Sequence, residues 1–132
     1  MKTIFLILGV LISTSSLGQT TTCEHSKLID SLTKKTVYQI VEFMPEPEGG
    51  MQVFYQRLLR NIKFKKPCQP IEFAFIVDEV SKIDGLRVLT KKYNNLENEI
   101  LEIVQNTKWK AGTCGGRKLP VILTISIKIK CG

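Results

Sequence analysis

The clearest structural signal in this sequence is an alternation of side chains near the C-terminus. Val121, Leu123, Ile125, Ile127 and Ile129 alternate with Ile122, Thr124, Ser126, Lys128 and Lys130. Successive side chains of a strand point to opposite faces, so the pattern predicts a strand with one apolar face. Such a strand belongs to a sheet that is covered on one face and open to solvent on the other, as antiparallel sheets often are. The rest of the chain must supply the other strands and the cover.

Three further segments have the composition or the alternation of strands. Residues 37–44 (VYQIVEFM) are rich in β-forming residues and end at a run of prolines and glycines. Residues 71–77 alternate bulky apolar side chains with other residues, and residues 82–90 are predicted to be the return strand of a hairpin. Two turns compete to join that hairpin, one at residues 78–81 and one at Asp84–Gly85.

Two other segments have the period of amphipathic helices. Residues 51–62 carry apolar side chains every four residues and polar ones on the opposite face. Asn94–Asn95 can cap a second helix that ends at residues 108–110, with glutamates in its first half, where the helix dipole favours anions. Three glycines predict that residues 111–118 form a loop.

The order of these elements is β-α-β-β-α-β over residues 37–132. It predicts an α+β fold of two layers, in which an antiparallel sheet carries two helices on one face. Residues 19–36 are polar and are expected to form an N-terminal arm. Within this arm, Leu28, Ile29 and Leu32 have the spacing of one short helical turn.

Residues 1–18 have the layout of a secretory signal peptide. Lys2 gives a positive start, residues 4–12 form an apolar run, and small residues precede a predicted cut after Gly18. A membrane anchor would need about 20 apolar residues, so this run is too short. A lipoprotein is the other alternative because Cys23 follows, but the threonines before it are not what a lipid-attachment cut prefers. We therefore expect an exported protein, either periplasmic or extracellular.

The residue types that most catalytic and metal sites need are scarce. The chain has one histidine, His25 in the polar arm, and none of the common phosphate-loop, zinc-protease or nucleophile-elbow motifs. Its four cysteines lack the CxxC spacing typical of zinc sites. After export they are expected to pair, and four cysteines allow three connectivities. We expect no metal, no cofactor and no enzyme activity, but a binding or structural module.

The net charge is +7, and part of it lies in residues 63–66 (KFKK). Such a run can bind an anionic surface, but it is more often a solvated connector. Because we expect the protein to be exported, we expect no nucleic-acid partner.

Several short motifs occur in a fixed order along the chain. VEFMPEPEGG stands directly before the first predicted helix, WKAG follows the second, and LPV opens the last strand. In order and spacing they resemble the V-E-x-M-P-E-F-P-G-G, W-K-P-G and K-P-V motifs of the C-terminal domain of TonB proteins, in its Bacteroidetes form. The residues that carry the resemblance are Met44, Pro45, Glu46, Gly49, Gly50, Trp109, Lys110, Gly112 and Pro120.

The resemblance implies a binding function. Domains of that family capture a short extended peptide of an outer-membrane receptor by adding it as a strand to the sheet edge. The resemblance therefore implies that the last strand is the partner-binding edge, and that the partner is a protein or peptide, such as the N-terminal segment of a TonB-dependent receptor. This would link the chain to transmembrane transport. The edge residues are Val121, Leu123, Ile125 and Ile127.

Other interpretations of the same features stay open. The last strand can be an ordinary edge guarded by Lys128 and Lys130. The chain can also be a disulfide-stabilised structural module that forms a homodimer through this edge, or a secreted inhibitor with no role in transport. Trp109 is expected to be a core anchor rather than a receptor contact. The membrane helix and Pro-rich spacer of the family's energy transducers are expected to be absent, so the resemblance does not imply force transmission.

The resemblance and the predicted topology also give expectations for the turn and the disulfides. Aligned with the family, the hairpin turn falls at Val80–Ser81, so the turn at residues 78–81 is preferred. In the predicted topology, Cys68 enters the sheet near the Cys114 loop, whereas Cys131 leaves it at the other end. We therefore expect the disulfides Cys68–Cys114 and Cys23–Cys131, the second of which would hold the arm.

Overall fold

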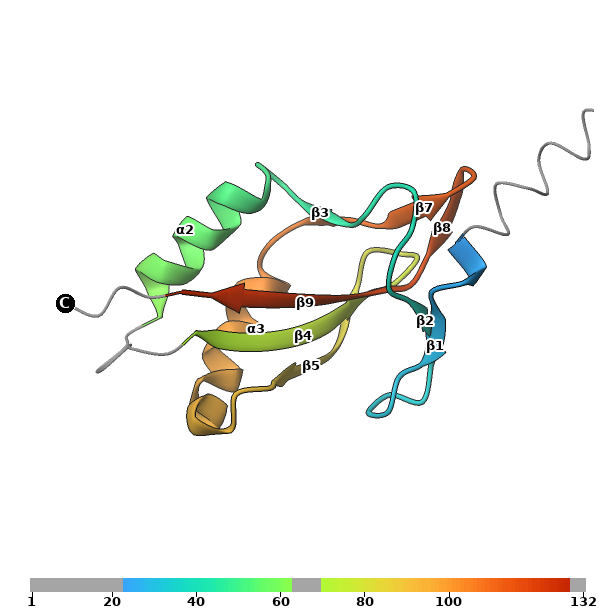
Figure 1. The fold of residues 1–132 in the computed structure, drawn as a ribbon. Coiled ribbons are helices and arrows are strands. Elements are labelled where there is room, and N and C mark those ends of the chain that lie inside the picture. The colour runs from blue at the N-terminus through green and yellow to red at the C-terminus, as the bar shows by residue number, and fades with distance from the viewer. Residues whose placement is uncertain (1–22, 63–69, 129–132) are drawn as a thin grey trace, which may run out of the picture.

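The computed structural model describes residues 23–62 and 70–128 (Figure 1). The predicted signal peptide, the basic stretch 63–66, Cys68 and Cys131 lie outside the described residues. Within the described ranges, no helix is long and apolar enough to cross a membrane. This part of the chain forms an antiparallel-rich sheet with two α-helices, which confirms the α+β class.

The main sheet has five strands. In order across the sheet they are β1 (Lys27–Ile29), β2 (Thr36–Tyr38), β9 (Val121–Ile127), β4 (Ile71–Val77) and β5 (Ile83–Val88). Neighbouring strands are antiparallel, except that β2 runs parallel to β9. Figure 1 shows β9 and β4 crossing the middle of the molecule, with β1 and β2 at one end of them.

The two helices, α2 (Met51–Asn61) and α3 (Glu97–Gln105), pack against the same apolar core. On β9, the buried side chains are the odd-numbered Val121, Ile125 and Ile127, as the alternation predicts. Burial of apolar area contributes about 25 cal/mol per Å², so this common core is the main source of stability. The core residues from helices and strands include Phe54, Leu58, Ile100, Val104, Ile71, Phe73, Phe75, Val77, Leu86, Val88, Ile125 and Ile127.

The second helix is shorter than the sequence pattern predicts. A 3-10 helix, η1 (Lys91–Leu96), precedes α3, and no side-chain hydrogen bond caps α3, so the predicted cap at Asn94–Asn95 is wrong. After α3, the Thr107 hydroxyl donates to the Ile103 carbonyl at 2.8 Å. That bond satisfies one of the carbonyls that a helix end leaves without a partner.

The β4–β5 hairpin turns where the preferred alignment predicts. Ser81 has a φ of 67°, in the left-handed region, and its amide donates to the Asp78 carbonyl at 3.0 Å. The Asp78 carboxylate accepts from the amides of Val80 and Lys82, at 3.0 and 2.8 Å. The rival turn at Asp84–Gly85 is instead a β-bulge, because the register shifts there and Gly85 has a φ of 62°.

Two short ladders lie outside the main sheet. β3 (Glu46–Pro47) pairs with β6 (Trp109–Lys110), and β7 (Gly112–Cys114) pairs with β8 (Arg117–Leu119). The glycine-rich segment 111–118 therefore contains a hairpin, and the prediction of a plain loop is wrong.

The N-terminal segment is also more ordered than the sequence predicts. The expected helical turn around Leu28, Ile29 and Leu32 is wrong, because β1 and β2 form an antiparallel hairpin of the main sheet. The strand predicted over residues 37–44 keeps strand pairing only around Val37 and Tyr38, apart from one bridge between Phe43 and Thr113.

Candidate functional site

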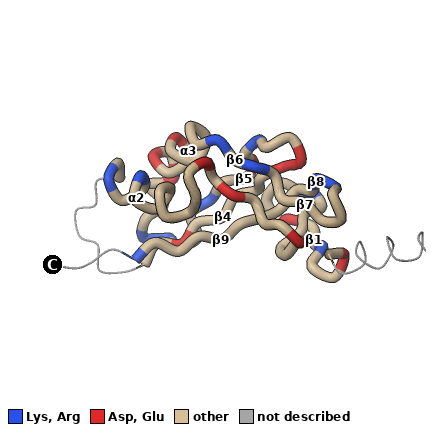
Figure 2. Tube along the Cα trace, turned by 90° about the horizontal axis from the view of Figure 1, so that it is seen from above, with Lys and Arg blue, Asp and Glu red and all other residues tan. Residues whose placement is uncertain are grey.

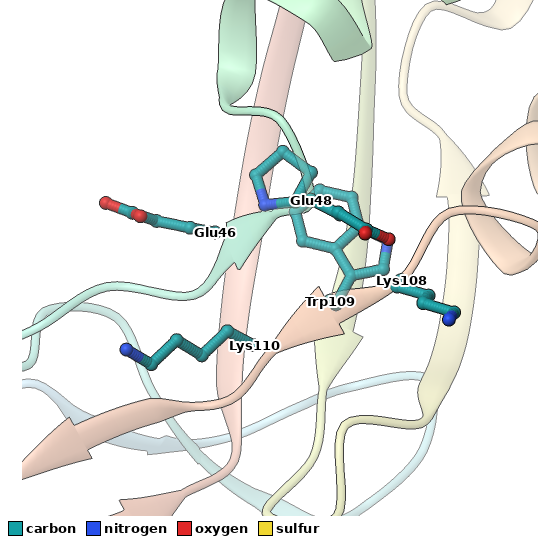
Figure 3. Close-up of a pocket in the computed structure, with 6 residues that line it drawn as sticks. Glu46, Glu48, Lys108, Trp109 and Lys110 are labelled. Carbon is teal, nitrogen blue, oxygen red and sulfur yellow. The ribbon is translucent and has the colours of Figure 1, made fainter.

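The two main motifs of the sequence lie side by side although they are far apart in the chain. Glu46 pairs with Lys110, and Pro47 pairs with Trp109, in the antiparallel β3–β6 ladder. Figure 3 shows the side chains of Glu46 and Lys110 extending to the same side of the two strands. A pocket of about 320 Å³ at this ladder is lined by Glu46, Pro47, Glu48, Lys108, Trp109 and Lys110.

Trp109 anchors this ladder to the core. Its side chain is buried, and its Nε1 donates to the Val104 carbonyl near the end of α3 at 3.0 Å. Its ring lies edge-on to Phe54 of α2 and Phe75 of β4, with centroids 5.1 Å away in both cases. A tryptophan with its polar atom satisfied and its ring between two aromatic side chains supports packing. The geometry thus favours the core-anchor interpretation over receptor contact.

Gly112 allows the close approach of three segments. A Cβ at this position would lie 2.8 Å from Val121 Cγ2, 3.0 Å from Pro45 Cδ and 3.1 Å from Val41 Cγ2. Two other motif glycines precede α2, with Gly50 at its N-terminus and both Gly49 and Gly50 at positive φ. Pro120 directly precedes β9, and its carbonyl accepts from the Tyr38 amide at 2.9 Å. Gly112 and Pro120 therefore shape backbone junctions around β9, whereas Gly49 and Gly50 shape the junction before α2.

The predicted edge strand lies between two other strands but is only partly covered. Along β4, β9 is paired over its whole length, from Val121 opposite Val77 to Ile127 opposite Ile71. On its other side, β2 pairs with β9 only where Tyr38 stands opposite Val121. The expectation of a free edge is therefore wrong at Val121. In a parallel pair, the groups of Tyr38 reach the residues on either side of its partner, so Ile122 is covered as well. From Leu123 onward, no strand of the described residues pairs with that side.

The hydrogen-bonding direction of β9 alternates, and two observations fix which residues face outward. The Pro120 carbonyl accepts from Tyr38, so the even-numbered residues direct their backbone groups toward the β2 side. On β4, Glu72 stands opposite Ser126, and its carbonyl accepts from Leu89, on the β5 side, at 2.7 Å. Two directly opposite residues of an antiparallel pair either both direct their backbone groups toward each other or both direct them away. Glu72 directs its groups to β5, so Ser126 directs its groups away from β4.

Thr124 and Ser126 therefore hold the outward-facing N–H and C=O groups of the β9 edge. The predicted site residues Leu123, Ile125 and Ile127 direct their backbone groups to β4, and Ile125 and Ile127 are buried. The alternation of the sequence could have identified the even-numbered residues, but it gave no sign of which side of the strand would be open.

The other two edges of the sheet are poorer templates for an added strand. β5 has the bulge at Gly85 and the charged residues Asp84 and Arg87. β1 has three residues. Bulges, charges and short length are common guards against strand pairing at an edge. By contrast, β9 is regular and uncharged over its seven residues, and Figure 2 shows it as an uncharged stretch.

The disulfide differs from both predicted pairings. Cys23 is bonded to Cys114, with a Cα–Cα distance of 6.5 Å, so the predicted Cys68–Cys114 and Cys23–Cys131 pairs are wrong. The prediction failed because β7–β8 lies beside the N-terminal hairpin, an arrangement that the topology inferred from sequence did not contain. The bond ties the start of the described chain to β7.

A buried ion pair holds the same hairpin to the edge strand β5. The Arg87 guanidinium donates to both oxygens of Asp30 at 2.8 and 2.9 Å, and Asp30 is 3% exposed. The hydrogen bonds from Arg87 hold the pKa of Asp30 well below its usual range, and the Thr33 amide and hydroxyl add to this effect against the opposing effect of burial. Neither Asp30 nor Arg87 was singled out in the sequence, since a contact across so many residues leaves no local pattern.

Two further contacts support the hairpin. The Lys35 ammonium lies 2.7 Å from Asp84 Oδ2, which raises the pKa of Lys35. The Tyr38 hydroxyl donates to Glu24 at 3.1 Å. Burial raises the pKa of Tyr38, and the bond to Glu24 adds to the shift. Residues 23–38 are thus fixed to the sheet and are not a loose arm.

Among the described residues, no group of three or more His, Cys, Asp or Glu side chains could hold a metal ion. Compared with known proteins, the chain matches no family model, no curated protein and no solved structure.

Proposed function

We propose that this protein is an exported binding module that captures an extended peptide segment of a protein partner at the edge of β9. The observation that carries the proposal is the regular and uncharged edge from Leu123 to Ile127, with which no strand of the described residues pairs on the side away from β4. An added strand would receive hydrogen bonds from, and donate them to, the outward-facing groups of Thr124 and Ser126. No catalytic role is assigned to the chain.

Helix α2 offers apolar surface next to this edge. In Figure 1, α2 lies on the side of β9 that faces away from β4. Arg57 donates to Thr107 Oγ1 at 3.1 Å, which marks the flank of α2 that faces the end of α3. Leu59 is two positions further, about 200° around the helix, and is 46% exposed. A captured strand would pack alternate apolar side chains against the flank of α2 that carries Leu59.

The motif resemblance to the TonB C-terminal domain supports a particular class of partner. It suggests the N-terminal segment of a TonB-dependent outer-membrane receptor, and hence a role linked to transmembrane transport. The Cys23–Cys114 disulfide fits an oxidising compartment, such as the periplasm or the exterior of the cell.

The proposal is tested with a proline at an outward-facing position. Thr124→Pro removes an N–H that points away from β4, so the sheet is expected to keep its stability within about 1 kcal/mol. An uncharged hexapeptide that alternates threonine and valine serves as the probe, and NMR follows the backbone amides. We expect the wild type to show shifts at Thr124 and Ser126, and Thr124→Pro to bind at least tenfold more weakly.

Two matched variants complete this test. Thr124→Ala keeps the N–H and is expected to bind like the wild type, whereas Ile125→Pro removes a ladder bond to β4 and is expected to destabilise the fold by about 3 kcal/mol or more. Equal peptide binding by the wild type and Thr124→Pro would contradict edge capture. Shifts at the same amides that grow with protein concentration, without peptide, would point to a homodimer instead. A pull-down from outer-membrane extract, with Thr124→Pro as the control, then tests for receptor N-terminal segments.

A further inference from the structure

The N-terminal hairpin covers the β9 edge at one end only. The Tyr38 amide donates to the Pro120 carbonyl at 2.9 Å, which aligns β2 with the first residue of β9, Val121. In a parallel pair, the next residues of β2 would have to continue beside Ile122 and Leu123. They do not, and this break is what leaves the rest of the edge open.

The cause of the break is a set of hydrogen bonds on the other side of β2. The Gln39 amide donates to the Ser26 carbonyl at 3.2 Å, and the Ile40 amide donates to Ser26 Oγ at 3.1 Å. Ser26 Oγ in turn donates to the Ile40 carbonyl at 2.8 Å. The Gln39 bond only continues the alternation of β2, because the neighbouring Tyr38 faces β9. Ile40 would face β9 in a continued strand, but its amide and its carbonyl are bonded to Ser26, so the backbone leaves β9 there.

Several contacts hold the hairpin against the rest of the fold. The Cys23–Cys114 disulfide ties its start to β7, and the Asp30–Arg87 ion pair ties its turn to β5. Between these two points, Val37 is fully buried and Tyr38 is 7% exposed. A strand that competed with β2 for the first residues of β9 would have to break this packing as well as the Tyr38 hydrogen bond.

We propose that β2 is a fixed stop at the Val121 end of the β9 edge, so that a captured strand can pair with β9 only from Leu123 toward Ile127. This inference rests on the proposed function and specifies its register. The ligand is a short extended segment that either ends at the stop or turns out of the sheet there. A segment that must stay extended beyond that point does not fit.

The test measures whether a long peptide displaces β2. Two nonapeptides are made by adding three residues to either end of the alternating threonine–valine hexapeptide, and amide hydrogen exchange is followed by NMR on the wild-type chain. We expect each nonapeptide to slow exchange at Thr124 and Ser126 at least fivefold. The Tyr38 amide, which is bonded to Pro120, is expected to keep its exchange rate within twofold.

A second variant removes the disulfide that fixes the start of the hairpin. In Cys23→Ser/Cys114→Ser, the start of the hairpin is released, and we expect a nonapeptide to accelerate Tyr38 exchange and to bind more tightly than the hexapeptide. If this variant does not fold, the wild-type exchange data decide alone. Accelerated Tyr38 exchange in the wild type would overturn the stop and leave edge capture standing. No protection at Thr124 and Ser126 with any peptide would overturn both.

Discussion

Pro47 stands directly opposite Trp109, so the segment before the first helix and the segment after the second are joined through one cross-strand pair. On the ladder itself, Glu48 adds a hydrogen bond from its amide to the Lys108 carbonyl at 2.8 Å. The Trp109 ring continues from this pair into the core between α2 and β4. The ladder therefore links both helices to the sheet, which explains why two distant motifs act as one structural unit.

Trp109→Ala is expected to lower the free energy of unfolding by about 3 to 5 kcal/mol, because it removes the largest side chain that joins these elements. Trp109→Phe keeps much of the ring packing but removes the hydrogen bond to Val104, so a loss of about 1 to 2 kcal/mol is expected. Urea denaturation followed by circular dichroism measures both. A Trp109→Ala variant as stable as the wild type would contradict the anchor role.

Asp30→Asn is expected to destabilise the fold by about 3 kcal/mol at pH 7, since it leaves the mostly buried Arg87 charge without its carboxylate. Asp84→Asn is the matched control, because it breaks an exposed pair with Lys35 and is expected to cost under about 1 kcal/mol. Denaturant titrations of both variants give the comparison. Equal losses would show that burial of the Asp30 pair is not what matters.

The same pair predicts a pH dependence with a definite sign. The pKa of Asp30 is lowered in the folded state, so its contribution to stability is complete above its unfolded pKa of about 4 and is lost as the pH falls below that value. The stability difference between the wild type and Asp30→Asn should stay constant between about pH 6 and 8 and shrink below about pH 4. A difference that grew on acidification would contradict the assignment.

The parts of this fold that the sequence predicts are those with a local period. The strand at Val121–Ile127 and the helix at Met51–Asn61 were recognisable because their apolar residues repeat every two or every four positions. The core-facing side of β9 followed from the same pattern.

The N-terminal hairpin could not be predicted in this way. Its position depends on the Asp30–Arg87 pair and the Cys23–Cys114 bond, which join residues far apart in the chain and have no local signature. The site was misjudged for the same reason. Since β2 covers Val121 and Ile122, the open part of the edge begins two residues later than the strand itself.

Gly112→Ala is expected to destabilise the fold by about 1 to 3 kcal/mol, because the new methyl group would overlap Val121 Cγ2. Val121→Ala alone creates a cavity in the core and is also destabilising. If the contact is the cause, the double variant should lose less stability than the sum of the single variants. If the two losses of stability simply add, the contact with Val121 is not the reason why Gly112→Ala destabilises the fold.

Mass mapping of non-reduced peptides is expected to find Cys23 linked to Cys114. In the chain-entropy model, closing a loop with a sequence separation of 91 stabilises the fold by about 4 to 5 kcal/mol, so Cys23→Ser/Cys114→Ser should show a loss of that order. Two outcomes would contradict this bond. One is a mass map in which Cys23 and Cys114 are each linked to a different cysteine, and the other is a Cys23→Ser/Cys114→Ser variant as stable as the wild type.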